Sequence, residues 1–316
     1  MSLTVESLSG DTMGTTWSAR VVVPAGVSLD DLQAGVQAQL DRVDAQMSTY
    51  KADSDLSRFN QAPAQTWVAL PGECFAVVQY ALRVAELTQG AYDPTVGPLV
   101  NAWGFGPDGV RADAPPDSVW MAARSRVGWQ RVLLRESTCE AWQAGGTYLD
   151  LSSVAKGFSV DVAGAWLTAQ GIEAWLMEVG GEMKGHGRKP DGMPWRVGIE
   201  WPDGSGQHSQ IVPLEGRAIA TSGNYRRHFA QGQQHFAHHI DPRSGMPSQN
   251  RVASVSVLAN SAMEADPWGT AMTVLGPDRG LSLARELRLA VLIYVQVADD
   301  FDERMSSAFA EALRAG

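Results

Sequence analysis

Two stretches far apart in the chain carry polar residues at spacings that suit phosphate and metal chemistry. The first, DLSSVAKGFSVD, starts at Asp150 and has the pattern of a strand end, a tight loop and a helix start. The amides and the dipole of a helix N-terminus attract anions, and Lys156 would add a positive charge there. The stretch therefore indicates an anion site. The structural alternative is that Asp150 caps the strand and Lys156 is a solvated helix residue.

The second stretch, SAMEADPWGTAMTVLG, begins with Ser261 and Glu264 at capping-box spacing, which predicts a helix start. Asp266 and Thr270 are four residues apart and share one helix face. A carboxylate beside a hydroxyl is an oxygen pair that suits magnesium or calcium. The alternative is that Thr270 bonds its own helix backbone and Asp266 only caps. Pro267 predicts a kink or a restart of this helix, because proline does not fit an unbroken helix interior.

A third stretch, HFAHHIDPRSG, places His235, His238 and His239 close to Asp241. Their spacing matches no standard zinc pattern, so we do not expect a zinc site. On an extended strand His238 and Ile240 would face one way, and His239 and Asp241 would face the opposite way. At most part of this set can therefore reach one pocket, and a hairpin end with exposed imidazoles is the structural alternative.

Composition and missing motifs narrow the function classes. The net charge is -10 and no face rich in Lys or Arg is apparent, which argues against nucleic acid. GxGxxG, P-loop and GxSxG patterns are absent, which disfavours a nicotinamide dehydrogenase, a kinase of the common type and a serine hydrolase. No apolar run is long enough to span a membrane. We expect Cys74 and Cys139 to be separate thiols.

The elements that must position these residues alternate between helices and strands over the whole chain. The 316 residues, 44% of them hydrophobic, fit a soluble globular protein. Hydrophobic periodicity predicts helices near 29–47, 73–88, 154–169, 263–275, 281–287 and the C-terminus, and strands near 17–23, 173–179, 195–201, 218–221, 236–240, 252–258 and 289–297. The apolar loop GAYDPTVGPLVNAWGFG must fill the core or line a ligand pocket. We predict one α+β unit over residues 1–316, with room for two lobes around a cleft.

Eight segments together resemble one known family. TMGTTW, MSTYKADSDLSRFN, YDPTVGPLVNAWGFG, YLDLSSVAKGFSVD, EVGGEMKGHG, ATSGNYRRHF, HHIDPRSG and SAMEADPWGTAMTVLG occur in the order and spacing of the ApbE family of FAD:protein FMN transferases. The resemblance runs from Asp11 to about Gly276. It implies a mixed α+β fold related to the T-fold, with FAD in a cleft and magnesium at its pyrophosphate. It also implies transfer of FMN from FAD to a threonine or serine of a partner flavoprotein, with release of AMP.

The resemblance also implies which residues act. The expected flavin and adenosine contacts are Met13, Tyr50, Ala91, Tyr92, Asp93, Asp150, Lys156 and Ile240. The expected magnesium ligands are the side chains of Asp266 and Thr270 and the loop at Ser153, through its carbonyl. His238 is the candidate general base, because imidazole titrates near neutral pH. Asp241 is its alternative, either as the base or as support for a neighbouring turn.

Three points depart from the family or stay open. Pro267 and Trp268 are bulkier than the residues usual between the metal-binding acid and threonine. Family members are usually exported, so we expect a periplasmic protein associated with the inner membrane in its full-length form. This sequence begins without an export signal, so a cytoplasmic location is the alternative. Rival activities are an FAD pyrophosphatase, which gives FMN and AMP with water as nucleophile, and a non-catalytic FAD-binding protein.

Overall fold

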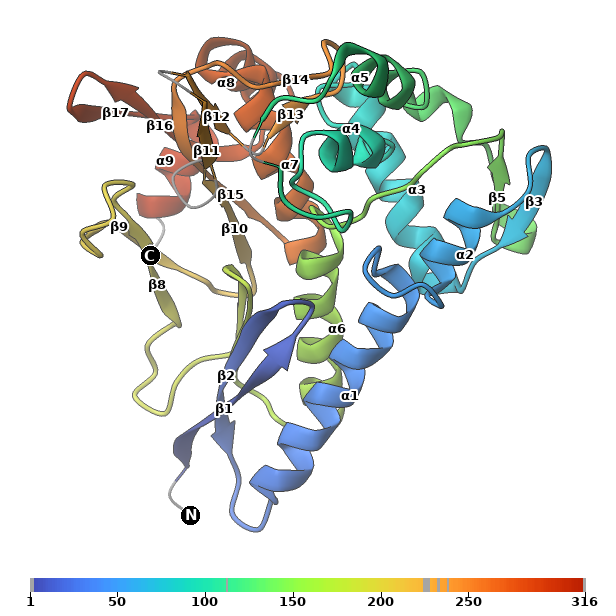
Figure 1. Cartoon of the computed structure of the whole chain (residues 1–316). Coiled ribbons are helices and arrows are strands. Elements are labelled where there is room, and N and C mark those ends of the chain that lie inside the picture. The colour runs from blue at the N-terminus through green and yellow to red at the C-terminus, as the bar shows by residue number, and fades with distance from the viewer. Residues whose placement is uncertain (1–2, 112, 224–227, 232–233, 238, 315–316) are drawn as a thin grey trace.

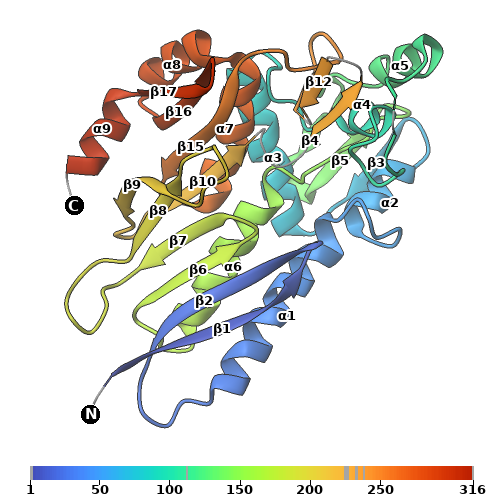
Figure 2. The same ribbon diagram turned by 60° about the vertical axis from the view of Figure 1, so that its left-hand side comes forward.

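An eight-stranded antiparallel sheet forms the centre of the computed structural model, which describes residues 3–111, 113–223, 228–231, 234–237 and 239–314. Neighbouring strands follow the order β1-β2-β6-β7-β10-β15-β16-β17 (Figures 1 and 2). Their bounds are Thr4–Thr12, Thr15–Val23, Trp175–Val179, Glu182–His186, Ala218–Gly223, Val252–Ala259, Ala290–Val297 and Asp300–Met305.

The sheet buries different amounts of each strand. In β2 the side chains of Trp17, Ala19 and Val21 are buried while Ser18 and Arg20 are exposed, as expected for a strand with one dry face. β15 is buried at every residue except its last. A strand without alternation must be covered on both faces. The predicted strands at 17–23 and 252–258 are therefore confirmed, and the second is an interior strand covered on both faces.

Helices cover one face of the sheet. They are α1 (Leu29–Met47), α6 (Ala155–Ala169) and α7 (Ala262–Leu275), and Figure 2 shows α1 and α6 beside β1, β2 and β6. The Ser28 side chain accepts a hydrogen bond from the Asp31 amide, which caps α1 as the sequence predicts. α7 packs on α6, β10 and β15. The helix N-termini that carry polar residues therefore lie against the middle of the sheet.

The opposite face carries a two-stranded ribbon and the C-terminal helix. The ribbon pairs β8 (Arg196–Glu200) with β9 (His208–Pro213), and the helix is α9 (Ser307–Arg314). Their apolar side chains form one buried cluster with Leu258 and Leu292 of the sheet. This layer completes the cover of the central strands, on the side away from α7 (Figure 1).

The remaining elements form a cap beside α1 and α7, apart from α8, which packs on α7 and β16. Three short strands pair in the order β3-β5-β4, and two ribbons pair β11 with β12 and β13 with β14. The bounds are Asp55–Gln61 (α2), Thr66–Ala69 (β3), Gly72–Leu87 (α3), Gly97–Ala102 (α4), Asp117–Arg124 (α5), Leu134–Arg135 (β4), Glu140–Gln143 (β5), His228–Gln231 (β11), Gln234–Ala237 (β12), Ile240–Asp241 (β13), Met246–Pro247 (β14) and Pro277–Glu286 (α8), with single 3-10 turns at Trp129–Arg131 and Glu136–Thr138. α3 and α7 contribute to one shared core.

One expectation is corrected and one strand was not predicted. α7 does not restart at Pro267, which lies buried inside one helix from Ala262 to Leu275. The helix is buried along most of its length, so packing against α6 and the sheet offsets the hydrogen bond that proline removes. β1 was not predicted. Only Leu8 and Thr12 of this strand are buried, so its sequence lacks the apolar alternation that identifies a strand.

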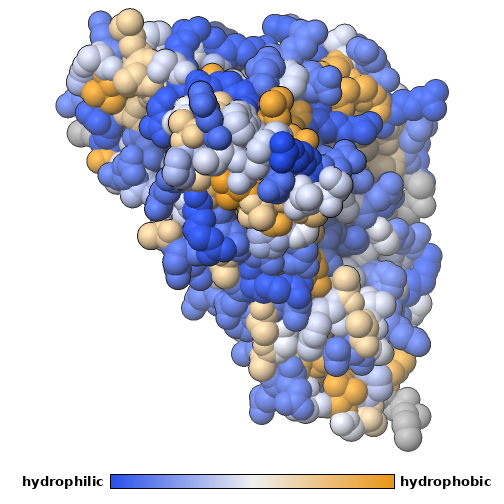
Figure 3. All heavy atoms as spheres, turned by 90° about the vertical axis from the view of Figure 1, so that its right-hand side faces the viewer, coloured by the Kyte–Doolittle hydropathy of each residue, from blue (hydrophilic) through white to orange (hydrophobic). Residues whose placement is uncertain are grey.

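The surface is mostly polar. Figure 3 shows hydrophobic residues in small separate groups on the face that it displays. In the described part of the chain, no helix combines the length and hydropathy that a membrane span requires. Cys74 is buried and Cys139 half-buried, and both are free thiols, as predicted.

Candidate active site

The two polar stretches of the sequence meet where α6 and α7 begin. The amide of Gly157, in the first turn of α6, donates to Asp266 Oδ2 of α7 over 3.1 Å. In return, the carboxylate of Asp161 in α6 accepts hydrogen bonds from the amides of Ala262 (3.2 Å) and Met263 (2.9 Å) at the start of α7. Each helix thus supplies an acid to the free amides of the other.

Gly157 makes this approach possible. A Cβ at that position would lie 2.2 Å from the carbonyl oxygen of Ala262, so no other residue fits without moving α7. The close packing of α7 therefore explains why a glycine follows Lys156 in the first turn of α6. The close contact brings Ser153, Asp266 and Lys156 into one region.

Asp266 and Thr270 differ from an ordinary cap and an ordinary helical threonine. Asp266 is only 4% exposed, and its hydrogen bond goes to the neighbouring helix rather than to its own. Thr273 bonds back to the carbonyl oxygen of Gly269 at 2.9 Å, whereas the Thr270 hydroxyl has no such bond among the described residues. The structural alternative for this pair is therefore weakened, and both side chains keep oxygen atoms for another ligand.

The loop before α6 is shaped by Asp150. Its carboxylate accepts hydrogen bonds from the Ser152 amide at 2.9 Å and from the Ser152 hydroxyl, which is an Asx-type turn. Its own amide donates to the carbonyl oxygen of Pro94 at 2.7 Å. Asp150 thus stabilises the turn at the end of its strand, which is the structural role named as the alternative. It also joins this loop to the segment that follows Gly90.

Asp93 stabilises the segment that follows Gly90 through hydrogen bonds of its buried side chain. It is 5% exposed, and its carboxylate accepts from the amide (2.8 Å) and hydroxyl (2.7 Å) of Thr95 and from the amide of Trp129 (3.0 Å). Burial raises the pKa of Asp93, while these hydrogen bonds lower it in part. The side chain therefore holds the loop in shape, and Ala91 and Tyr92 beside it are buried.

The Tyr92 hydroxyl marks the point where the acids converge. Burial raises the pKa of Tyr92, and the nearby Asp266, Asp150 and Asp93 raise it further. The Ser153 side chain lies near this hydroxyl and lowers the pKa somewhat, yet the hydroxyl has no hydrogen-bond partner of good geometry among the described residues. A buried polar atom without a partner is rare and points to a missing ligand or water.

The structure adds a residue that the sequence analysis missed. Glu182, the first residue of β7, accepts a hydrogen bond from Lys156 Nζ at 2.6 Å. Burial, together with nearby Asp266, raises the pKa of Glu182 from its usual 4.5 to about 7, while Lys156 lowers it in part. The signal was present in EVGGEM, where an acid directly follows a glycine pair.

Charge and donor type in this region fit a magnesium ion. Burial also raises the pKa of Asp266, whose charge is offset mainly by Lys156. A divalent cation would favour the charged form of both buried acids. Within the described residues no three His, Cys, Asp or Glu side chains share a metal-binding arrangement. The predicted set of one carboxylate with hydroxyl and carbonyl oxygens would instead offer only oxygen ligands, which magnesium prefers.

Three further predicted contacts come from separate elements. Met13 forms the β1–β2 turn with φ of 46°, and the turn borders a hollow of about 550 Å³ lined by residues 11–16, Asp41 and Asp44. Tyr50 follows α1 and is 67% exposed. Ile240 is 5% exposed and packs in a cluster with Leu99 and Trp103. These contacts are thus spread over both the sheet and the cap.

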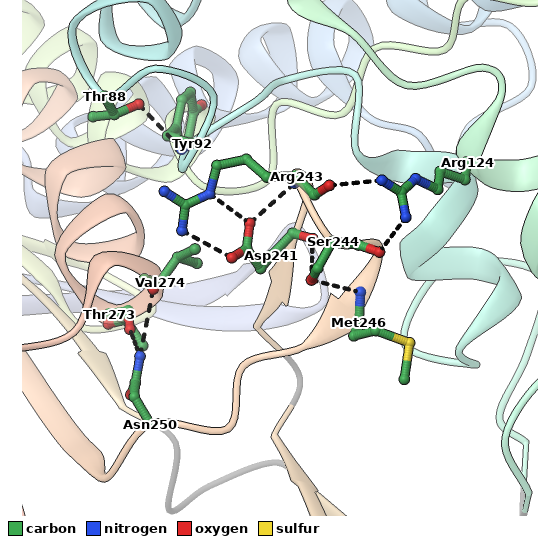
Figure 4. A network of polar contacts seen from close by, with 10 residues as sticks. All are labelled: Thr88, Tyr92, Arg124, Asp241, Arg243, Ser244, Met246, Asn250, Thr273 and Val274. Atoms are coloured by element: carbon green, nitrogen blue, oxygen red, sulfur yellow. Dashed lines mark hydrogen bonds and ion pairs between the residues drawn. The ribbon is translucent and has the colours of Figure 1, made fainter.

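A polar network fixes the turn that follows Ile240 (Figure 4). Arg243 pairs with Asp241 at 2.8 Å, and Arg124 of α5 donates to the carbonyl oxygens of Ser244 (2.7 Å) and Arg243 (2.9 Å). Asp241 therefore supports the turn, as the alternative reading states. His238, the predicted base, lies outside the described residues.

The chain matches known proteins over nearly its full length. The sequence model of the ApbE family matches residues 13–293. A FAD:protein FMN transferase of Vibrio cholerae serotype O1 is 41% identical over 304 residues, 96% of this chain and 91% of the relative, and that of Haemophilus influenzae is 37% identical over 314 residues, 96% and 90% of the two chains.

Solved structures agree with these relatives. The apo flavinyl transferase ApbE of Pseudomonas stutzeri superposes with a TM-score of 0.91 at 36% identity, and covers 99% of this chain and 98% of that one. The flavin transferase ApbE of Vibrio cholerae gives a TM-score of 0.90 at 39% identity, over 98% and 100% of the two chains. The predicted α+β fold and the resemblance are thereby confirmed, and the chain belongs to the ApbE family.

Proposed function

We propose that this protein transfers FMN from FAD to a threonine or serine hydroxyl of a partner flavoprotein, with magnesium, and releases AMP. The observation that carries the proposal is the junction of α6 and α7, where the buried Asp266 accepts a hydrogen bond from the Gly157 amide and lies close to Lys156. The relatives that match 96% of this chain are FAD:protein FMN transferases, and this supports the reaction class.

In this proposal the chain supplies positions and charges. A magnesium ion held by Asp266, Thr270 and a Ser153 oxygen would neutralise charge on the pyrophosphate. Lys156 stands at the same helix start and offers a further positive charge to phosphate oxygens. Asp150 and the Asp93 loop shape the wall that would hold the nucleotide, with Met13, Tyr50, Ala91, Tyr92 and Ile240 as further contacts.

The covalent step is a phosphoryl-type transfer. The acceptor oxygen forms a bond to the phosphorus of the FMN part, the bond from that phosphorus to the AMP oxygen breaks, and the hydroxyl proton must leave. We propose that His238 takes this proton. His238→Ala should then retain FAD binding but lose roughly a hundredfold or more in transfer rate, together with an ionisation near neutral pH. Weaker FAD binding with an unchanged pH profile would instead mean that His238 only contacts the flavin.

One incubation separates the proposed activity from its rivals. The purified protein is mixed with FAD and magnesium, with and without a flavoprotein subunit that carries a Thr or Ser target site, and AMP and protein-bound flavin are measured. A transferase releases AMP only when the acceptor is present. The acceptor then carries covalent flavin and is fluorescent in a denaturing gel. AMP without acceptor identifies a pyrophosphatase, and no AMP in either mixture identifies a carrier.

A further inference from the structure

Glu182 contacts the ammonium group of Lys156 from inside the protein. Its side chain is only 4% exposed, and Oε1 lies 2.6 Å from Lys156 Nζ. The second oxygen, Oε2, is buried and has no hydrogen-bond partner among the described residues. The carboxylate is thus held inside the protein, with the lysine ammonium as its close charged neighbour.

The stem of Lys156 is confined as well. Gly180 adopts φ of +58°, and a Cβ there would lie 3.3 Å from Lys156 Cδ and 3.0 Å from the methyl group of Thr15. The lysine therefore runs between the Gly180–Gly181 turn and the end of the β1–β2 hairpin. With its stem held there and its ammonium tied to Glu182, the direction of the positive charge is determined by two neighbouring strands.

We propose that Glu182 is a positioning residue that fixes the Lys156 ammonium beside Asp266, so that it meets the phosphate groups of FAD. This inference rests on the proposed function, because it assigns Lys156 to the pyrophosphate. A preset cation avoids the cost of ordering a long, flexible side chain when the nucleotide binds. Asp266 alone, which is buried and acidic, would otherwise attract the same ammonium away from the nucleotide.

The test is a double-mutant cycle on FAD affinity. Glu182→Gln keeps an acceptor oxygen of the same shape but removes the charge, and Lys156→Met removes the ammonium while keeping the stem length. FAD dissociation constants are measured by flavin fluorescence with magnesium present, and KM and kcat for AMP release are measured alongside. Glu182→Gln should weaken FAD binding about tenfold or more, as expected for one charge-assisted hydrogen bond, and should change KM more than kcat.

The decisive comparison is the double variant. If Glu182 acts through Lys156, Glu182→Gln adds no further loss in the Lys156→Met protein. Losses that multiply would mean that Glu182 contacts metal or nucleotide independently, and would overturn the inference. Unchanged affinity in Glu182→Gln would overturn it as well. Should this variant not fold, Glu182→Asp, which shortens the reach by one methylene, takes its place in the same cycle with the same expectations.

Glu178 provides the matched control. It flanks the same glycine turn from β6, accepts hydrogen bonds from the Gly181 amide (2.8 Å) and the Ser18 hydroxyl (3.1 Å), and does not touch Lys156 in the described contacts. Glu178→Gln should leave FAD affinity unchanged, and an equal loss in both variants would show that only the turn matters. A wild-type protein that binds FAD but transfers nothing would contradict the proposed function, yet its FAD affinities would still test Glu182.

Discussion

The Asp266 carboxylate accepts a hydrogen bond from the Gly157 amide over 3.1 Å, so a residue of α7 completes the first turn of α6. This bond explains why two stretches more than a hundred residues apart act as one unit. It also gives Asp266 two roles, since the same carboxylate is the proposed charged ligand of magnesium. Substitutions at this junction can separate the two.

Asp266→Asn should abolish the metal dependence while leaving the fold intact. Asparagine retains an oxygen that can accept from Gly157, but it lacks the charge that magnesium requires. The transfer rate should fall by at least about a hundredfold. Changing even a residue that only hydrogen-bonds to a metal ligand lowers metal affinity or activity by about 10–100-fold. AMP release against magnesium concentration measures the loss, and thermal unfolding of the metal-free protein checks the fold.

Asp161→Asn is the control for that experiment. Asp161 joins the same two helices through the Ala262 and Met263 amides, but it is not a proposed metal ligand. It should lower the unfolding temperature and leave the magnesium concentration for half-maximal activity unchanged. Full activity in Asp266→Asn, or an equal change in metal dependence in both variants, would contradict the assignment of Asp266.

Gly157→Ala should destabilise the protein although alanine normally favours helices. Its Cβ would lie 2.2 Å from a backbone oxygen of α7, so the helices must separate. Overpacking of this kind costs typically about 1–3 kcal/mol. Gly72→Ala in the first turn of α3 is the control, since a Cβ there meets nothing within 4 Å. Urea unfolding should show a lower midpoint for the first variant and an unchanged or higher midpoint for the second.

Periodicity located most of the elements that hold the site. The helices at Leu29–Met47 and Ala155–Ala169 have long apolar faces and clear starts, so the pattern fixed them within a residue or two. β1 was missed because its exposed face and its few buried residues leave no alternation. The helix at 263–275 was predicted, but the restart allowed at Pro267 does not occur, because packing with α6 and the sheet keeps one helix.

The sequence indicated individual residues of the candidate site, but it did not indicate which of them contact one another. Asp266 and Thr270 could be selected because their spacing places them on one helix face. The role of Asp161 and the pairing of Lys156 with Glu182 depend on which helices and strands lie side by side. Sequence spacing within one element does not contain that information, since both contacts join separate elements.

Glu182 should make the metal-free protein less stable as the pH rises. Its pKa is 4.5 ordinarily and about 7 in the fold, so between these values the folded state binds more protons than the unfolded state. The free energy of unfolding therefore falls as the pH rises through this window. Glu182→Gln lacks this contribution, so its unfolding temperature should fall less between about pH 5 and pH 7.

Calorimetry of both proteins with a chelator present measures this difference. Asp93 and Asp266, whose pKa values are also raised by burial, are present in both and contribute to both curves. Parallel curves for wild type and Glu182→Gln would show that the Glu182 pKa is not raised in the folded protein.

The two thiols should differ in reactivity. Burial raises the pKa of Cys74 to about 12, and the thiolate is the form that reacts. Cys139 is half-buried at a turn. Iodoacetamide at neutral pH should therefore modify Cys139 in the native protein and both thiols after unfolding, as measured by intact mass. Rapid native labelling of Cys74 would show that α3 opens readily. Cys139→Ser, which should react only when unfolded, is the control.

The direction of β1 bears on how the protein can be immobilised. Thr4 and the Met13 turn are at opposite ends of this nine-residue strand, and a strand of that length spans roughly 30 Å. An affinity tag or a surface linker joined before Thr4 would thus emerge at the far end of the hairpin (Figure 1). The opposite end of the hairpin, where Thr15 and the Lys156 stem both lie against Gly180, would then point away from the surface.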